Sequence, residues 1–338
     1  MKKLKRIFAV IIAVMMILSF ASCKGNDTGT TTATQPGETK APQIDVIIPS
    51  ADYESKIRVA STNDILGLVT AKIRTDKSYA CEIPGDCADF NEVAAKLKNS
   101  QADIGVLPLH MAADLYKETN GAVKIIAATS GNSLQVITKD ENVSSLSSLR
   151  GKKVYSAVSG TYEEDIVKYV FGKSGVDFDS VIVSDGLTYN EIVTKAIAGE
   201  IETCILPEPY ASKVTLTNEK YKSVVSLNDV YETKSGATAL QGCFVARTEY
   251  IESNPDLVYE FMSFCEIFTN YYLNFTEGAA IELYAHNYFS SESLAYGTIV
   301  NGNYFYAEGE ALTSLVNDNL KVIGISDLKA ADLCHVKQ

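Results

Sequence analysis

Short apolar runs alternate with amphipathic stretches along most of the chain. Runs rich in β-branched residues predict strands at 56–61, 80–83, 102–108, 123–129, 133–138, 153–157, 180–183 and 243–246. Apolar residues at spacings of three and four predict helices at 64–73, 91–98, 111–117, 162–172 and 190–198. Strands that alternate with helices are typical of an α/β fold, for which we expect mainly parallel sheets.

After residue 246 the pattern changes, and we expect helices nearly to the end of the chain. Asn254, Pro255 and Asp256 have the order of a helix cap, a first-turn proline and a first-turn acid. Large apolar residues follow at helical spacing: Val258, Phe261, Met262, Cys265, Phe268 and Tyr272. We interpret this stripe as core. Late helices of this kind typically pack on an earlier sheet, so the first and last thirds are expected to share a lobe.

The beginning of the chain has the pattern of an export signal. Four basic residues among the first six precede an apolar run of 14 residues, 7–20. A membrane-spanning helix needs roughly 20 apolar residues, so we interpret residues 1–22 as a signal peptide. The run ends in Phe20-Ala21-Ser22-Cys23, which is similar to a bacterial lipobox and predicts a lipid on the thiol of Cys23. The alternative is an ordinary signal peptide with a cysteine at this place by chance.

Composition divides the rest of the chain into a tether and a folded body. Residues 24–55 are rich in Thr, Gly, Pro and Gln, so we expect a flexible tether after the lipidated Cys23. The remaining 280 or so residues suffice for one large or two modest domains. The formal net charge is −12, and removal of residues 1–22 lowers it to −16. Such an acidic protein is not expected to bind nucleic acid.

The cysteines do not suggest a metal or redox site. Besides Cys23 there are six, and none has the CxxC spacing of such sites, so most are expected to be small core residues. Cys81 and Cys87 flank a Pro-Gly turn, which leaves a local disulfide open in an exported protein.

Polar loops follow several predicted strands, at 61–64, 107–110, 129–132, 159–162 and 206–210. In open α/β sheets, ligands bind beyond the carboxyl ends of the strands, where helix N-termini present free N–H groups. Thr161 and Glu164 have capping-box spacing, which predicts a helix start that can hold an anion or a polar head group. Two prolines stiffen the last loop, which carries Glu208 and Tyr210. Plain helix capping is the alternative for each loop.

Three of these segments carry a resemblance to a known family. They are Ala-Asp-Ile-Gly-Val-Leu-Pro at 102–108, Leu-Arg-Gly-Lys-Lys-Val at 149–154 and Leu-Pro-Glu-Pro-Tyr at 206–210. In sequence, order and spacing they resemble bacterial substrate-binding proteins of the nitrate/sulfonate/taurine and thiamine-pyrimidine-precursor type. The resemblance covers roughly residues 57–278.

The resemblance implies a type II periplasmic-binding-protein fold, in which two α/β lobes hold a ligand between them. Crossings near 129–133 and 239–243 would divide the chain into lobe I (56–131 and 241–338) and lobe II (132–240). The implied ligand contacts are Thr62, Asn63, His110, Ser130, Asn132, Gly160, Thr161, Glu208 and Gln241. No cofactor or metal is implied. The implied partners are a small solute and the permease of an ABC importer. The protein would be a monomer anchored on the outer face of the cytoplasmic membrane.

Two other classes of function are weaker. A fungal pyrimidine-precursor synthase has this fold, but it relies on a cysteine cluster that this sequence lacks, and the three histidines are scattered without metal-binding spacing. We therefore do not expect an enzyme. A surface lipoprotein without a transport role would leave the two-lobe pattern without a purpose.

The cargo stays open between two chemistries. If Glu208 faces the cleft, a bare anion such as nitrate or a sulfonate is disfavoured, because like charges in a dry pocket repel. The arginines are spread out and form no anion site. We therefore favour an amine-bearing heterocycle such as a vitamin precursor, with Tyr162 and Tyr210 as stacking faces.

Overall fold

The computed structural model describes residues 56–336 apart from 63–65, 67 and 76–80. The described residues belong to one compact unit. The predicted signal peptide, the lipidation at Cys23, the tether and the ligand contact Asn63 all lie outside the described residues.

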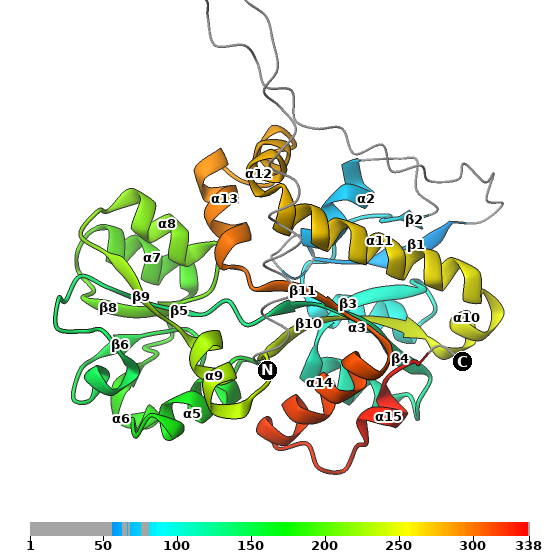
Figure 1. The fold of residues 1–338 in the computed structure, drawn as a ribbon, viewed down its shortest axis with the longest axis horizontal. Helices are drawn as coiled ribbons and strands as arrows, with labels where there is room; N and C mark the ends of the chain where they lie inside the picture. Colours follow the sequence, from blue (N-terminus) through cyan, green and yellow to red (C-terminus); the bar gives the residue numbers. More distant parts are fainter. Residues whose placement is uncertain (1–55, 63–65, 67, 76–80, 337–338) are drawn as a thin grey trace, which may run out of the picture. The chain divides into compact units, whose positions relative to one another are not determined.

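The larger of the two sheets has six strands in the order β11-β4-β10-β3-β1-β2 (Figure 1). They are β1 (Ile57–Ala60), β2 (Cys81–Glu82), β3 (Ile104–Pro108), β4 (Val123–Gly131), β10 (Leu240–Arg247) and β11 (Tyr304–Ala307). Successive side chains of a strand point to opposite faces. Val106 and Phe244 accordingly belong to the core on one face, whereas Leu107 and Val245 belong to the core on the other. Strands from the first and last thirds of the chain thus lie in one sheet.

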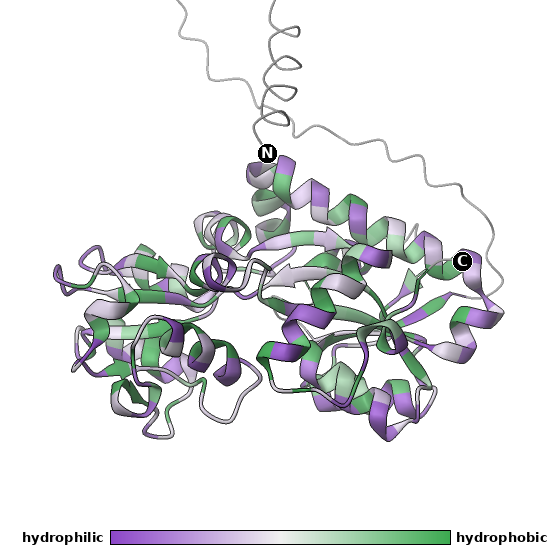
Figure 2. Cartoon of the chain, turned by 60° about the horizontal axis from the view of Figure 1, so that its bottom comes forward, coloured by the Kyte–Doolittle hydropathy of each residue, from purple (hydrophilic) through white to green (hydrophobic). Residues whose placement is uncertain are grey.

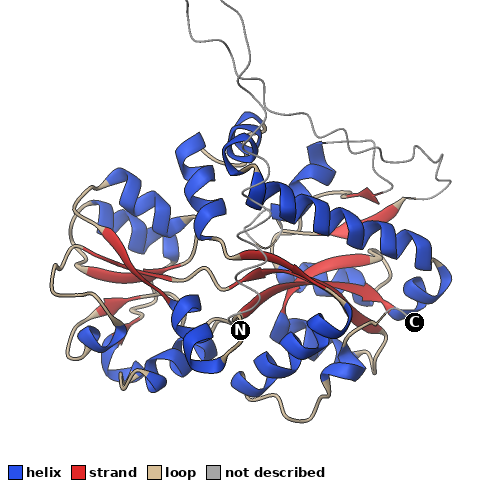
Figure 3. Ribbon diagram, in the orientation of Figure 1, coloured by secondary structure: helices blue, strands red, loops and turns tan. Residues whose placement is uncertain are grey.

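Helices pack on both faces of this sheet (Figure 3). They are η1 (Leu68–Thr70), α2 (Ala71–Thr75), α3 (Phe90–Lys98), α4 (Leu109–Glu118), α10 (Thr248–Ser253), α11 (Pro255–Asn274), α12 (Thr276–Ala285), α13 (Glu292–Asn301), α14 (Gly309–Val322) and α15 (Ala330–Leu333). Figure 2 shows the hydrophilic and hydrophobic residues along these helices, of which long α11 buries an apolar side.

Helix α11 confirms the predicted core stripe. All six apolar residues of the stripe are buried, and they pack against strand residues such as Ile57 and Ile126. The helix starts at Pro255 as predicted. The Asn254 side chain does not cap it but donates a hydrogen bond back to the carbonyl of Tyr250 (3.5 Å).

The smaller sheet has five strands in the order β7-β6-β8-β5-β9. They are β5 (Gln135–Thr138), β6 (Val154–Tyr155), β7 (Ile182–Val183), β8 (Thr203–Leu206) and β9 (Lys222–Ser226). The helical elements of this part are η2 (Leu146–Leu149), α5 (Glu164–Lys173), α6 (Phe178–Val181), α7 (Tyr189–Ile197), α8 (Tyr210–Thr217) and α9 (Leu227–Ser235). This sheet too is buried on both faces, because Val136 and Ile137 of β5 belong to different core clusters.

Two segments connect the sheets: the chain leaves β4 for β5 and returns from α9 into β10. The N–H of Asn132 in the first segment donates to the carbonyl of Ala239 in the second, at 2.7 Å. Buried Asn319 of α14 accepts a hydrogen bond from the N–H of Leu240 and donates one to the carbonyl of Thr238, both at 2.9 Å. The two crossings are therefore tied to each other and to one helix.

The expectation of mainly parallel sheets is wrong. Strands β1, β2 and β3 pair in parallel, as do β6, β7 and β8. Strand β10 runs antiparallel to both β3 and β4, and β5 runs antiparallel to both β8 and β9. The reversal occurs at the strands that carry the crossings, since a chain that returns from the other sheet enters from the opposite end.

Other local predictions also need correction. The predicted strand 180–183 is helix α6 followed by the two-residue β7. The last third is not wholly helical, because β11 pairs antiparallel with β4. Its signal is the alternation of Tyr304, which packs on one face of the sheet, and Phe305, which packs on the other. Elements α8, β9 and α9 come from a stretch in which the pattern predicted none.

The possible disulfide between Cys81 and Cys87 is not present. Both residues are buried free thiols, and they belong to different core clusters.

Among the helices of the described part, none is both long enough and apolar enough to cross a bilayer.

Candidate functional site: a cavity between the two sheets

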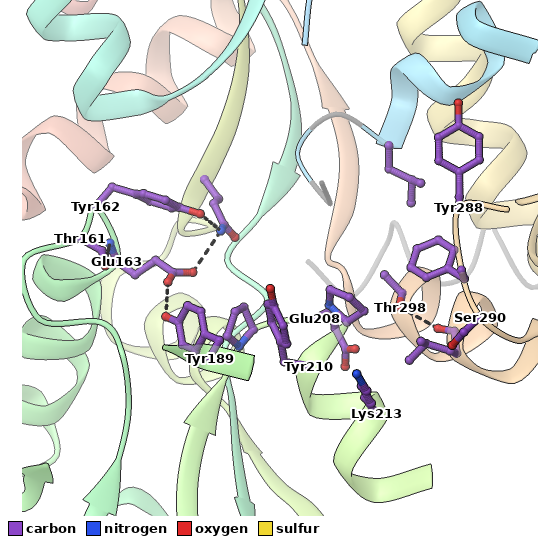
Figure 4. Close-up of a pocket in the computed structure, with 16 residues that line it drawn as sticks. Thr161, Tyr162, Glu163, Tyr189, Glu208, Tyr210, Lys213, Tyr288, Ser290 and Thr298 are labelled. Carbon is purple, nitrogen blue, oxygen red and sulfur yellow. Dashed lines mark hydrogen bonds between the residues drawn. The ribbon is translucent and has the colours of Figure 1, made fainter. Parts of the chain in front are cut away.

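A cavity of about 420 Å³ lies between elements of the two sheets (Figure 4). We call the side built from smaller-sheet elements the acidic wall: Thr161, Tyr162, Glu163, Tyr189, Pro207, Glu208, Pro209, Tyr210 and Lys213. We call the side built from larger-sheet elements the apolar wall: Leu68, Gln241, Tyr288, Phe289, Ser290, Leu294 and Thr298. A cavity of this volume is suited to one small ligand.

Glu163 lies just before α5 and is 2 % exposed. One carboxyl oxygen accepts a hydrogen bond from the Tyr189 hydroxyl (2.6 Å), and the other accepts one from Nε2 of Gln241 (3.2 Å). Burial raises the pKa of Glu163 to about 7, against the opposing effect of these two donors. The carboxyl therefore gains or loses its proton near neutral pH.

Glu208 lies just before α8 and is also 2 % exposed. Its carboxyl accepts hydrogen bonds from the N–H of Ser212 and from Nδ2 of Asn301, both at 3.2 Å, and from the Ser212 hydroxyl. Burial raises the pKa of Glu208 to about 7 as well, since these neutral donors only partly offset the loss of water.

A chain of hydrogen bonds runs between the two acidic loops through a crossing segment. The N–H of Glu208 donates to Oγ of Ser133 (3.3 Å), and the N–H of Ser133 donates to Oε1 of Gln241 (3.3 Å). Nε2 of Gln241 then donates to Glu163 and to the Tyr162 hydroxyl (2.9 Å). Any movement of one sheet relative to the other must change this chain.

Aromatic rings form much of the lining. The rings of Tyr189 and Tyr210 stack at 5.5 Å between centroids. Tyr288 and Phe289 face the cavity from the loop between α12 and α13. Lys213 is exposed and is the one basic residue among the described lining residues. The interior is therefore aromatic and acidic.

Of the predicted ligand contacts, the structure brings Thr161, Glu208 and Gln241 together around the cavity. Tyr162 and Tyr210, predicted as stacking faces, also line it. The other described members of the predicted set do not appear among the lining residues: Thr62, His110, Ser130, Asn132 and Gly160.

Four of these residues, His110, Asn132, Thr62 and Ser130, lie outside the cavity lining in surroundings that the structure defines. His110 stacks on Tyr162 at 5.7 Å between ring centroids, and burial lowers its pKa. Asn132 holds the crossing, since its Oδ1 also accepts a hydrogen bond from the N–H of Leu134 (2.9 Å). The hydroxyls of Thr62 and Ser130 are buried and have no hydrogen-bond partner among the described residues.

The predicted capping box of Thr161 and Glu164 is wrong. Oγ1 of Thr161 accepts from the N–H of Glu163 (3.2 Å), and the Glu164 carboxylate accepts from the N–H of Gly160 (2.5 Å). The helix starts at Glu164, two residues later than predicted, because residues 161–163 form a turn that points Glu163 inward.

The sequence patterns missed Glu163, Tyr189 and the Tyr288–Phe289 pair. Glu163 directly follows the predicted ligand loop 159–162, but the capping-box spacing points to Glu164 instead. The pair Tyr288-Phe289 lies between the polar residues His286-Asn287 and Ser290-Ser291, and such a polar cluster is the available sequence signal for a loop.

The described residues contain no group of three or more His, Cys, Asp or Glu side chains placed to hold a metal ion. What the cavity offers is shape, aromatic faces, amide donors and two carboxyl groups.

Comparisons with known proteins agree with this architecture. The NMT1/THI5-like family matches residues 86–274, more than half of the chain. A comparison with curated proteins finds no match.

Three solved structures illustrate the fold. An ABC transporter protein from Parabacteroides distasonis has a TM-score of 0.69 at 18% identity, covering 84% of this chain and 100% of its own. The periplasmic aliphatic sulphonate binding protein SsuA from Escherichia coli has a TM-score of 0.66 at 12% identity, covering 85% and 94%.

The third is a Candida albicans protein described as exhibiting the generic periplasmic binding protein structural fold. It has a TM-score of 0.55 at 13% identity, covering 84% of this chain and 97% of its own. At these identities the likeness concerns the fold. The chain belongs to the NMT1/THI5-like family and has the type II periplasmic-binding-protein fold that its sequence motifs predicted.

Proposed function

We propose that the chain is an extracytoplasmic solute-binding receptor that hands one small amine-bearing heterocycle to the permease of an ABC importer. Lobe I (56–131 and 241–338) and lobe II (132–240) close on the cargo as a monomer, without cofactor or catalysis. The two crossings and the strand composition of the sheets support these lobe boundaries. Closure removes water from the cavity and strengthens each polar contact.

One observation carries the choice of cargo: two buried carboxyls, Glu163 and Glu208, face one aromatic cavity in which the only described basic residue is the exposed Lys213. A sulfonate or nitrate in this cavity would lie near two groups that ionise at neutral pH. An amine would neutralise them, and stacking on Tyr189 and Tyr210 would hold a ring.

A thermal-shift screen of the full-length protein tests the proposal. The panel contains thiamine, aminopyrimidines and benzylamines, whose aminomethyl group is protonated at neutral pH, matched by taurine, benzenesulfonate and nitrate. A ligand at 100 times its dissociation constant adds about 2.7 kcal/mol to the unfolding free energy, so a specific amine should raise the melting temperature visibly. Stabilisation by the anions alone would refute the cationic cargo.

The membrane anchor has its own test. Cys23→Ala should abolish incorporation of a radiolabelled fatty acid and release the protein from the membrane fraction. A matched Cys87→Ala variant should keep the label, because Cys87 is buried in the folded body. Continued labelling of the Cys23→Ala protein would refute the anchor.

A further inference from the structure

The cavity contains two separate acidic positions. Glu163 and Glu208 come from loops that precede different helices, α5 and α8. The Tyr189 hydroxyl binds Glu163, and the Tyr189 ring stacks on Tyr210, which follows Glu208 by two residues. Figure 4 shows the tyrosine pair between the two carboxyls. The acidic positions are thus set at the two ends of an aromatic surface.

Neither carboxyl has its charge balanced by the described protein. Glu163 accepts hydrogen bonds from a tyrosine hydroxyl and a side-chain amide, and Glu208 accepts them from the backbone N–H and the hydroxyl of Ser212 and from a side-chain amide, all neutral. A buried carboxylate without a cation is strongly unfavourable. Each carboxylate has about four acceptor positions, so two donors to Glu163 and three to Glu208 leave room for a ligand.

We propose that the cargo is a flat two-ended cation: an aromatic or heteroaromatic ring with one amine that binds Glu163 and a second that binds Glu208. The inference rests on the proposed function, which requires only one amine. The ring lies along the Tyr189–Tyr210 pair, and the volume of about 420 Å³ accommodates one such molecule. A ligand with a single amine leaves one carboxyl unpaired.

Three probes of nearly equal size separate one amine from two: 1,4-bis(aminomethyl)benzene, 4-methylbenzylamine and 4-methylbenzyl alcohol. Isothermal titration calorimetry of the full-length protein in detergent at pH 8 measures each dissociation constant. We expect the diamine to bind at least roughly tenfold more tightly than the monoamine, and the alcohol to bind most weakly.

Single variants then assign each end. Glu163→Gln and Glu208→Gln keep the side-chain shape and should each weaken diamine binding by roughly 10- to 100-fold. Glu200→Gln is the matched control, because Glu200 is exposed, lies on the smaller-sheet side and forms an ion pair with Lys195 at the surface. It should bind the diamine as the unaltered protein does. Melting curves check that each variant is folded.

The outcomes distinguish the two proposals. Equal affinity for diamine and monoamine in the unaltered protein overturns the two-ended cargo and leaves the proposed function standing; this comparison does not depend on any variant. Benzenesulfonate binding more tightly than either amine overturns both proposals. Failure of both amines to bind also counts against both.

Discussion

The two walls of the cavity differ in kind. The acidic wall carries both buried carboxyls, whereas the apolar wall offers hydrocarbon, aromatic rings and neutral polar groups. Larger-sheet elements nevertheless reach each carboxyl with one amide, Gln241 for Glu163 and Asn301 for Glu208. An amide satisfies a hydrogen bond without neutralising a charge. One side of the molecule can therefore select the cargo by charge, while the other completes the enclosure and leaves that charge for the ligand.

The largest expected effect is the pH dependence of the unfolding free energy, which the two carboxyls of the acidic wall cause. The pKa values of Glu163 and Glu208 are raised from 4.5 to about 7, so the folded protein binds more protons than the unfolded chain between these pH values. The unfolding free energy of the empty protein should therefore fall as pH rises from 4.5 to 7, by on the order of 3 kcal/mol per carboxyl.

Chemical denaturation at pH 5 and pH 8 checks this. The double variant Glu163→Gln/Glu208→Gln should show a flatter pH dependence and should be more stable than the unaltered protein at pH 8. Identical pH profiles of the unfolding free energy for the double variant and the unaltered protein would show that burial does not raise the pKa values of the two carboxyls.

The next effect tests whether the two walls must meet. A Cβ on Gly297 of α13 would lie 2.5 Å from Oγ and 3.1 Å from Cβ of Ser212 in α8. Gly297→Val should therefore hold the helices apart and weaken binding of the best amine probe by roughly 100-fold. Adding Ser212→Gly should restore part of the affinity. Calorimetry that finds unchanged affinity for Gly297→Val would mean that binding does not need this contact.

The pH dependence of binding should have the opposite sign to that of stability. A cationic ligand binds the ionised carboxyls, so its affinity should rise as pH rises through about 7 and level off above pH 8. The slope should reach at most about tenfold per pH unit for each carboxyl. Calorimetry in buffers of different ionisation enthalpy should detect proton release on binding. Affinity that is constant from pH 6 to pH 8 would contradict a direct contact between ligand and carboxylate.

The smallest effect concerns a contact between the two walls of the cavity. Tyr162 of the acidic wall accepts a hydrogen bond from Gln241, and its ring stacks on His110 of α4. Tyr162→Phe removes the hydroxyl but keeps the ring, so affinity should fall by about fivefold, the value of one neutral hydrogen bond. Tyr169→Phe, a tyrosine away from the cavity in the same helix region, is the control. Equal affinities of the two variants would show that the Tyr162 hydroxyl does not contribute to ligand binding.

The parts of the fold that were predictable are those that local patterns control. Strands β1, β3 and β4 follow from continuous apolar, β-branched runs, since both of their faces are buried. Helices α3, α4, α7 and α11 follow from helical spacing, since this spacing reflects which side is buried. The two-residue β7 is too short for a periodic signal, and β11 offers only four alternating residues within a mainly helical stretch. The antiparallel entry of β10 depends on where the returning chain meets the sheet.

The site was predictable to the extent that it lies on loops after strands. The loop rule led to Thr161 and Glu208, and the contacts implied by the family resemblance added Gln241. It failed for Glu163, because a shift of two residues in the helix start decides whether Glu163 or Glu164 faces inward.

The sequence by itself determined the family, the α/β class and the presence of a glutamate on a stiff, proline-rich loop, because each is a property of adjacent residues. Only the tertiary structure decided which carboxyls share a cavity. Glu163 meets Tyr189 and Gln241 across 26 and 78 residues of chain, and Glu208 meets Asn301 across 93. The shifted pKa values arise from burial by these distant elements, and burial is a property of packing that no local pattern contains.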